Sequence, residues 1–136
     1  MKTVILIRGV AGAGKSTVAN ILISNRGYVS VSADDYFVDT DGNYNFDATQ
    51  IHLAHADCQL KFLNFLKEPS TDVIIVDNTN VDMSAIETYK KLAEEYGSMF
   101  VSLIVENRHG NESIHNVPSY ILDRQESKIL DCIKLR

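Results

Sequence analysis

The sequence predicts an α/β fold in which helices cover both faces of a parallel sheet of about four strands. Four short apolar segments, rich in β-branched residues, alternate with segments whose apolar residues recur at helical spacing. Short connections between the segments favour βαβ units. A glycine-rich segment, 9–16, lies between the first strand and the first helix. We therefore expect a single three-layer αβα domain over residues 1–136, with the strand order 2-3-1-4.

The expected strands are continuous apolar runs, which is typical of parallel strands that are covered on both faces. The first helix should end near 25–27, where Gly27 suits a left-handed C-cap. Asp47 is a candidate N-cap for the second helix, and Gly97 is expected to close the third. A last helix should start at Val117–Pro118. The strands are expected at 3–7, 28–32, 72–77 and 100–105, and the buried stripe of the second helix at Ile51, Ala54, Cys58, Phe62 and Phe65.

The composition excludes several classes of protein. The chain is 45% hydrophobic, and no apolar run reaches the roughly 18 residues of a membrane span. The first residues are expected to form a strand and a phosphate loop, not a signal peptide, and Cys58 and Cys132 lack metal-like spacing. We therefore expect reduced, buried thiols and a cytoplasmic location. The net charge of −5 makes binding of a long nucleic-acid duplex unexpected. A small acceptor, or only the end of a strand, fits this charge better.

Residues 9–16 have the spacing G-x-x-x-x-G-K-S of a phosphate loop. Glycines let backbone N–H groups surround a phosphate chain, and the following helix adds its positive end. A glycine-rich turn that merely starts a helix is the alternative, but it does not require the whole motif. Lys15 would reach the β- and γ-phosphates and Ser16 would ligate Mg²⁺. The predicted nucleotide-binding residues here are Gly9, Gly12, Ala13, Gly14, Lys15, Ser16 and Thr17.

Carboxylates follow the second and third strands. Asp34 and Asp35 end the second strand and Asp77 ends the third, so all three should lie at the edge of the sheet that carries the phosphate loop. An acceptor hydroxyl needs a base near the γ-phosphate, although these acids also suit helix caps. We predict a role at the acceptor for Asp35, Asp77, Asn78 and Asn80, and Mg²⁺ binding by Ser16 and Asp77.

Transferred phosphoryl groups usually also require an arginine. Arg108 lies in a long polar segment after the fourth strand, and Arg124 follows it. We predict that both bind the nucleotide phosphates and that Arg108 is catalytic. A plain solvated charge remains the alternative for each arginine.

Two further patterns receive no functional role. The segment Asp39–Tyr44 begins like a calcium loop, but it lacks the later ligands and is interpreted as a turn. His52 and His55 are three residues apart on the second helix, without a nearby carboxylate at ligand spacing.

Five motifs in the same order resemble the kinase domain of bacteriophage polynucleotide 5′-kinase and its small P-loop relatives. The resemblance implies ATP-dependent transfer of the γ-phosphoryl group to a hydroxyl, typically the 5′-OH end of a nucleic acid. It also implies that Asp34 is the general base, that Asp77 or Asn78 lies beside the acceptor, and that Arg108 covers the ATP phosphates. The matching segments are 9–16, 33–36, 77–80, 107–108 and 116–118.

Two positions depart from that pattern. Phe37 replaces an arginine that contacts the acceptor in the phage enzyme, and Glu112 stands where a second lid arginine is expected. Loss of two cations weakens the binding of a phosphate-bearing strand. Three hypotheses therefore stay open: a kinase for a polynucleotide or nucleotide 5′-OH, a small-metabolite kinase on the same scaffold, and a low-turnover ATP-binding regulatory module.

Overall fold

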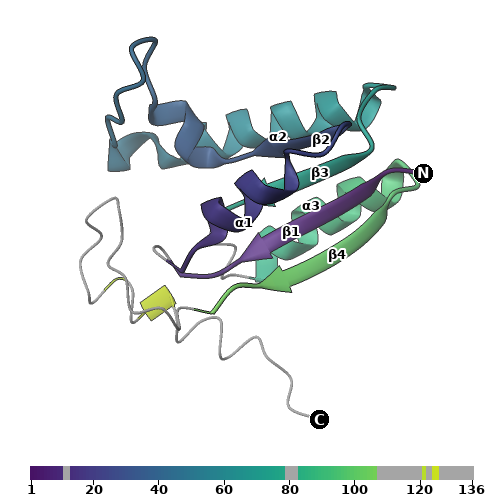
Figure 1. Cartoon of the computed structure of the whole chain (residues 1–136). Coiled ribbons are helices and arrows are strands. Elements are labelled where there is room, and N and C mark those ends of the chain that lie inside the picture. The colour runs from purple at the N-terminus through teal and green to yellow at the C-terminus, as the bar shows by residue number, and fades with distance from the viewer. Residues whose placement is uncertain (11–12, 79–82, 107–120, 122–123, 126–136) are drawn as a thin grey trace.

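The computed structural model describes residues 1–10, 13–78, 83–106, 121 and 124–125. Its centre is a parallel sheet of four strands in the order β2-β3-β1-β4 (Figure 1). The sheet confirms the predicted fold class and strand order, and each strand boundary lies within one residue of the predicted one. The strands are β1 (Thr3–Arg8), β2 (Tyr28–Val31), β3 (Val73–Asp77) and β4 (Met99–Ile104).

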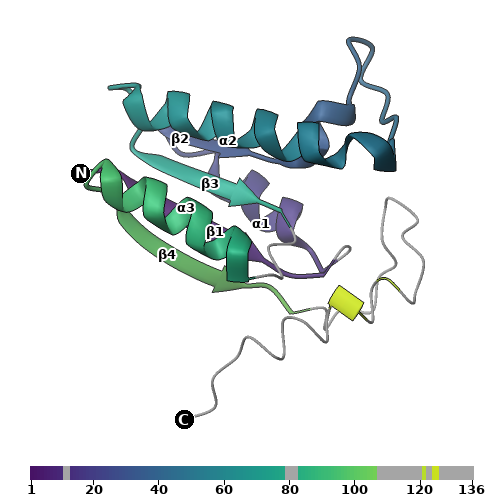
Figure 2. The ribbon, with the colours of Figure 1, turned by 180° about the vertical axis from the view of Figure 1, so that it is seen from behind.

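Helices cover both faces of this sheet. α1 (Lys15–Leu22) lies on one face, and α2 (Ile51–Lys67) and α3 (Met83–Glu95) lie on the other, as the opposite views of Figures 1 and 2 show. Two short 3-10 helices, η1 (Ala33–Phe37) and η2 (Ala48–Gln50), lead from β2 to α2. Among the helices in the described ranges, none has the length and apolar character needed to cross a membrane.

Alternation along β1 divides the core between the two faces. Val4 and Leu6 are fully buried in the cluster that α2 and α3 cover, whereas Ile7 packs with Ala19 of α1. Successive strand residues point to opposite faces, so a strand covered on both sides must be apolar at nearly every position. The continuous apolar run that predicted β1 is therefore the direct consequence of the layered fold.

The first helix is shorter than expected. α1 ends at Leu22, and Gly27, with φ +82°, lies in the turn before β2 and is not the helix C-cap. The Ser24 hydroxyl donates to the Ile21 carbonyl at 2.7 Å, and the Asn25 amide donates to the Leu22 carbonyl at 2.9 Å. These side chains satisfy the last helical carbonyls and replace a further helical turn.

The start of the second helix also differs from the prediction. Asp47 caps η2, where its carboxylate accepts from Thr49 N at 3.0 Å, and α2 begins only at Ile51. Ile51, which was predicted to be buried, is 42% exposed. At the other end of α2, Leu66 is buried in place of Phe65. Cys58 is buried as expected. Cys132 and most of the predicted last helix lie outside the described residues.

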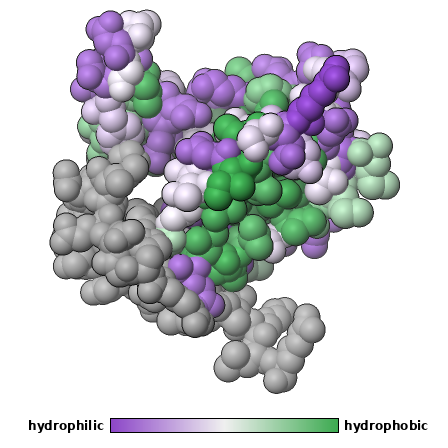
Figure 3. Space-filling view, in the orientation of Figure 1, coloured by the Kyte–Doolittle hydropathy of each residue, from purple (hydrophilic) through white to green (hydrophobic). Residues whose placement is uncertain are grey.

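β4 forms an edge of the sheet and is only partly covered within the described chain. Met99, Val101 and Leu103, on one face of β4, are each at least 40% exposed, as is Ile21 on α1. These residues contribute to the apolar area that Figure 3 shows over α1 and β4. The polar residues described next lie where the two central strands, β1 and β3, end.

Candidate active site

The phosphate loop joins the end of β1 to the start of α1. Gly14 adopts φ +103°, a left-handed conformation that glycine reaches without strain, and directly precedes the first residue of α1. A Cβ on Gly9 would lie 2.7 Å from the Val105 carbonyl oxygen. The backbone thus needs glycine at both positions, for conformation at Gly14 and for a close approach at Gly9. Ala13 is buried within the loop.

Lys15 is the first residue of α1 and is only 9% exposed. Its Nζ donates to the Val10 carbonyl at 2.9 Å, so the ammonium lies against its own loop. Burial lowers the pKa of Lys15, and the charges of Asp77 and then Asp34 act in the opposite direction. A cation held in this way favours an anionic ligand, because a phosphate would restore the solvation that the ammonium lost.

Asp77 and Ser16 meet across the sheet edge. β3 pairs in parallel with β1, with Ile7 and Asp77 in register, and the Ser16 hydroxyl donates to Asp77 Oδ2 at 3.1 Å. Burial raises the pKa of Asp77, while the Ser16 hydrogen bond and Lys15 oppose the increase. A carboxylate and a hydroxyl are oxygen ligands of the kind Mg²⁺ accepts, together with phosphate and water.

A larger protein-only metal cage is not present in the described ranges, which contain no group of three His, Cys, Asp or Glu side chains suited to a metal. Phosphate-loop sites do not need one, because the nucleotide and water supply most ligands of Mg²⁺. The Ser16–Asp77 pair therefore fits Mg²⁺ that arrives with a nucleotide.

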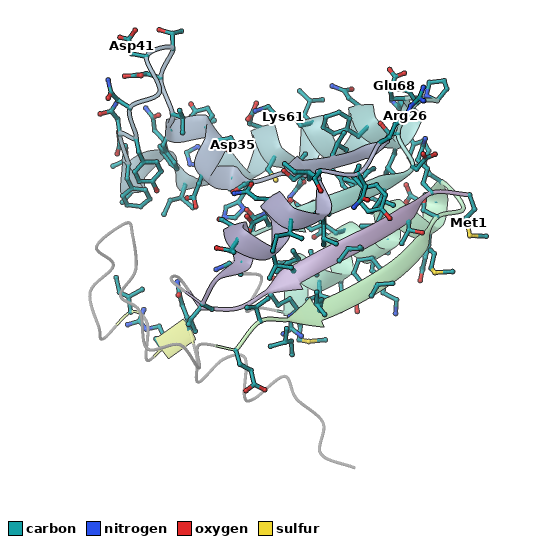
Figure 4. The ribbon with its side chains drawn as sticks, viewed as in Figure 1. Met1, Arg26, Asp35, Asp41, Lys61 and Glu68 are labelled. Carbon is teal, nitrogen blue, oxygen red and sulfur yellow. The ribbon has the colours of Figure 1, made fainter. Side chains whose placement is uncertain are left out.

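Asp34 and Asp35 lie on η1, directly after β2. Ser32 caps η1 by accepting from Asp34 N at 3.2 Å, so both carboxylates project from a fixed turn. Asp34 is exposed, and its Oδ1 accepts from the Tyr44 hydroxyl at 3.2 Å. Partial burial raises the pKa of Asp35 and the charge of Lys61 on α2 opposes it; Figure 4 labels both residues.

Asn78 directs its amide inward and is 8% exposed. Its Oδ1 accepts from Ala33 N at 2.8 Å, and its Nδ2 donates to Cys58 Sγ at 3.6 Å. The same sulfur accepts from the Tyr89 hydroxyl at 3.3 Å. Asn78 therefore links the end of β3 to η1, α2 and, through Cys58, α3, and these bonds direct its amide toward the core.

The remaining predicted residues fall into two groups. Thr17 is exposed in the first turn of α1, and Arg124 is exposed in a short helical segment. Gly12, Asn80 and Arg108 lie outside the described residues, as does Glu112.

Two residues near the site were not found from the sequence. Tyr44 reaches Asp34 from a loop ten residues further along the chain, and nothing in the sequence indicates that contact. Arg8, 6% exposed, directly precedes Gly9. The sequence did indicate this residue, because a charged side chain between an apolar strand and a phosphate loop is a candidate for the phosphate site.

A family model for AAA domains, AAA_33, matches residues 4–110, which run from the second residue of β1 through the phosphate loop and past the end of β4. The chain belongs to this family. This chain has a P-loop kinase-like fold, since its described strand order agrees with that of solved structures similar to it in shape.

One curated relative of this AAA_33 chain is human (Homo sapiens) NEDD4-binding protein 2. The two are 34% identical over 93 residues, which are 68% of this chain and 5% of that protein. The AAA_33 chain thus spans about a twentieth of this relative's length.

Solved structures similar in fold include the following two. A chain of the Pnkp1/Rnl/Hen1 RNA repair complex superposes with a TM-score of 0.74 at 17% identity, over 99% of this chain and 47% of that chain. The Mycobacterium tuberculosis APS kinase CysC superposes with a TM-score of 0.54 at 15% identity, over 96% of this chain and 95% of that chain. At these identities the likeness concerns the fold.

Proposed function

We propose that this AAA_33 chain is an ATP- and Mg²⁺-dependent phosphotransferase whose acceptor is the 5′-OH of a polynucleotide or nucleotide. The observation that carries the proposal is the meeting of Lys15, the Ser16–Asp77 pair and Asp34 at one edge of the sheet. These residues provide a phosphate-binding cation, oxygen ligands for Mg²⁺ and a candidate base. Such a set serves phosphoryl transfer, in which positioning and electrostatics supply most of the catalysis.

The donor half holds ATP through the phosphate loop. Backbone N–H groups at the start of α1 bind the phosphate chain, and Lys15 moves from the Val10 carbonyl to the β- and γ-phosphates. Ser16 and Asp77 would hold Mg²⁺, which would supply positive charge beside the phosphate chain. Arg108 and Arg124 are proposed to bind the same phosphates.

The acceptor half centres on Asp34. Asp34 accepts the proton of the acceptor hydroxyl as that oxygen forms a bond to the γ-phosphorus. The bond from the γ-phosphorus to the β,γ-bridging oxygen breaks, and ADP leaves with that electron pair. Asp35 and Asp77 are proposed to lie beside the acceptor, and Asn80 is proposed to contact it.

An exposed ring near Tyr44, the hydrogen-bond partner of Asp34, favours a base-bearing acceptor. Phe46 is 56% exposed, and its ring lies nearly parallel to that of Tyr44, with centroids 6.5 Å apart. Tyr44 in turn contacts Asp34. Stacking of a nucleobase on an aromatic ring is worth about 1–3 kcal/mol. We therefore propose that Phe46 stacks on the base of the acceptor.

A transfer assay with a defined set of acceptors tests this proposal. Wild-type protein with γ-labelled ATP and Mg²⁺ should label a 5′-OH oligonucleotide or adenosine in preference to gluconate and glycerol. Phe46→Ala should lower kcat/KM for the base-bearing acceptor about tenfold, the lower part of the stacking range. Leu53→Ala, which removes another exposed apolar side chain from the start of α2, should change it less than twofold.

Each opposite result supports one alternative. Label on the ringless compounds alone would favour a small-metabolite kinase, for which Phe37 in place of an arginine is the supporting observation. Absence of label from all four acceptors, with ATP binding intact, would favour the regulatory module.

A further inference from the structure

Residues 38–46 form a braced hairpin that projects from η1 (Figure 1). Val38 and Tyr44 make an antiparallel bridge, and Asn45 N donates to the Phe37 carbonyl at 2.8 Å. Asp39 Oδ1 accepts from the backbone N–H groups of Asp41 and Asn43, each at 2.9 Å. These bonds hold the tip of the hairpin in one shape.

The calcium-like pattern that begins at Asp39 thus has a structural use. The second carboxylate oxygen, Oδ2, accepts from the Asn45 side chain at 3.2 Å. These hydrogen bonds, first of all those of Asn43, lower the pKa of Asp39, so the carboxylate stays ionised near neutral pH. Asp39 is the centre of the hairpin and stabilises its turn.

Aromatic packing fixes the base of the hairpin. Phe37 is 7% exposed, and its ring contacts those of Tyr36, Tyr44 and Phe46 edge-on, at centroid distances of 5.4, 6.2 and 5.2 Å. Such pairs add about 0.5–1.5 kcal/mol beyond their buried area. The ring at position 37, where the phage kinase has an arginine, therefore supports the segment that carries Tyr44.

We propose that Tyr44 is a positioning residue for Asp34, held in place by the hairpin 38–46 and by Phe37. The inference rests on the proposed function, since it assumes that Asp34 is the base. The Tyr44 hydroxyl donates to Asp34 Oδ1 at 3.2 Å. That bond restricts rotation of the carboxylate and sets the direction in which Oδ2 meets the acceptor hydroxyl.

The protonation of Tyr44 agrees with a donor role. Burial, followed by the charge of Asp34 and their hydrogen bond, raises the pKa of Tyr44 to about 12. The phenol therefore keeps its proton at neutral pH and does not compete with Asp34 for the proton of the acceptor.

Tyr44→Phe tests the inference, because phenylalanine keeps the ring that packs on Phe37 and removes only the donor. With a 5′-OH oligonucleotide and with adenosine, kcat should fall on the order of tenfold, since misplacing a reacting group by a fraction of an ångström is costly. KM for ATP and the melting temperature should stay unchanged. Tyr36→Phe, which removes the hydroxyl of the neighbouring tyrosine in the same aromatic cluster, is the matched control and should keep the wild-type kcat.

A double variant separates this inference from the proposed function. In single-turnover assays, Tyr44→Phe should have no further effect once Asp34→Asn has removed the base. A further loss of rate, an unchanged kcat in Tyr44→Phe, or a loss of kcat that follows a lowered melting temperature would overturn the role of Tyr44. Failure of Asp34→Asn to slow transfer would instead overturn the proposed function.

Discussion

Asn78 connects four elements through one buried amide. Its oxygen accepts from Ala33 N on η1, and its nitrogen donates to Cys58 on α2, which in turn accepts from Tyr89 on α3. Because Ala33 precedes Asp34 directly, the amide of Asn78 ties the candidate base to the end of β3. We propose that this side chain acts on the acceptor by positioning η1.

Replacing Asn78 with alanine should destabilise the protein by about 1–3 kcal/mol, because the buried Ala33 N–H would lose its acceptor. The free energy of unfolding in urea measures this loss. Asn25→Ala is the matched control, since the Asn25 amide bonds a helix-end carbonyl at an exposed position and should change stability by roughly 0.5 kcal/mol or less. Equal losses for the two variants would show that Asn78 does not link these elements.

Individual residues could be placed from the sequence where the phosphate-loop motif or the end of a strand located them. Asp34 and Asp77 follow apolar strands, and parallel strands end at one edge, so their proximity was predictable. The inward direction of the Asn78 amide depends on Cys58, twenty residues away, and on a backbone N–H of η1. The contact of Tyr44 with Asp34 depends on a hairpin whose shape no local pattern specifies.

At the level of elements, the turn before β2 sets the register of two strands. The Gly27 carbonyl accepts from Asp72 N at 2.8 Å and from Val73 N at 3.2 Å, and Tyr28 and Val73 pair at the start of β2 and β3. Gly27 has φ +82°, and a Cβ there would collide with the Asp72 carboxylate. The same glycine was predicted to end α1, because a left-handed glycine serves helix ends and turns alike.

Gly27→Ala and Gly42→Ala form a matched pair. Both glycines are left-handed, with φ +82° and +84°, but a Cβ on Gly42 meets no atom within 4 Å. Gly42→Ala should cost about 1–2 kcal/mol, the strain of a left-handed alanine. Gly27→Ala should cost at least as much, because the exposed Asp72 side chain must also move away. Urea unfolding of both variants measures the difference. A smaller loss for Gly27→Ala would mean that the turn moves away from Asp72 without consequence.

At the scale of the whole molecule, the order of strands and helices was predictable, and so was the end of α3, where Gly97 has φ +67° two residues after Glu95. The limits of the first two helices were not. When continuous apolar strands alternate with amphipathic helices, few arrangements bury all the apolar faces, and a parallel sheet with helices on both sides is one of them. The end of a helix depends on a small difference in free energy between one more helical turn and side chains that bond the last carbonyls. Ser24 and Asn25 make such bonds at the end of α1. The AAA_33 family model matches residues 4–110, a range that contains the phosphate loop and most of the layered sheet.

The arrangement of the whole molecule divides the proposed reaction between two groups of elements. The loop after β1 and the end of β3 carry the donor residues, whereas η1 and the hairpin carry Asp34 and its hydrogen-bond partner Tyr44. Substitutions in the first group should impair nucleotide binding, and those in the second should impair transfer alone.

Parallel measurement of ATP binding and γ-phosphoryl transfer in wild-type, Lys15→Ala and Asp34→Asn proteins tests this division most directly. With Mg²⁺ and a 5′-OH oligonucleotide, Asp34→Asn should keep ATP affinity within about threefold and lose at least a hundredfold in transfer, the lower limit for a general base. Lys15→Ala should lose ATP binding, and chelation of Mg²⁺ should stop transfer by the wild-type protein. Wild-type transfer rates in Asp34→Asn, or unchanged ATP binding in Lys15→Ala, would contradict the proposal that this sheet edge is the active site of a phosphotransferase.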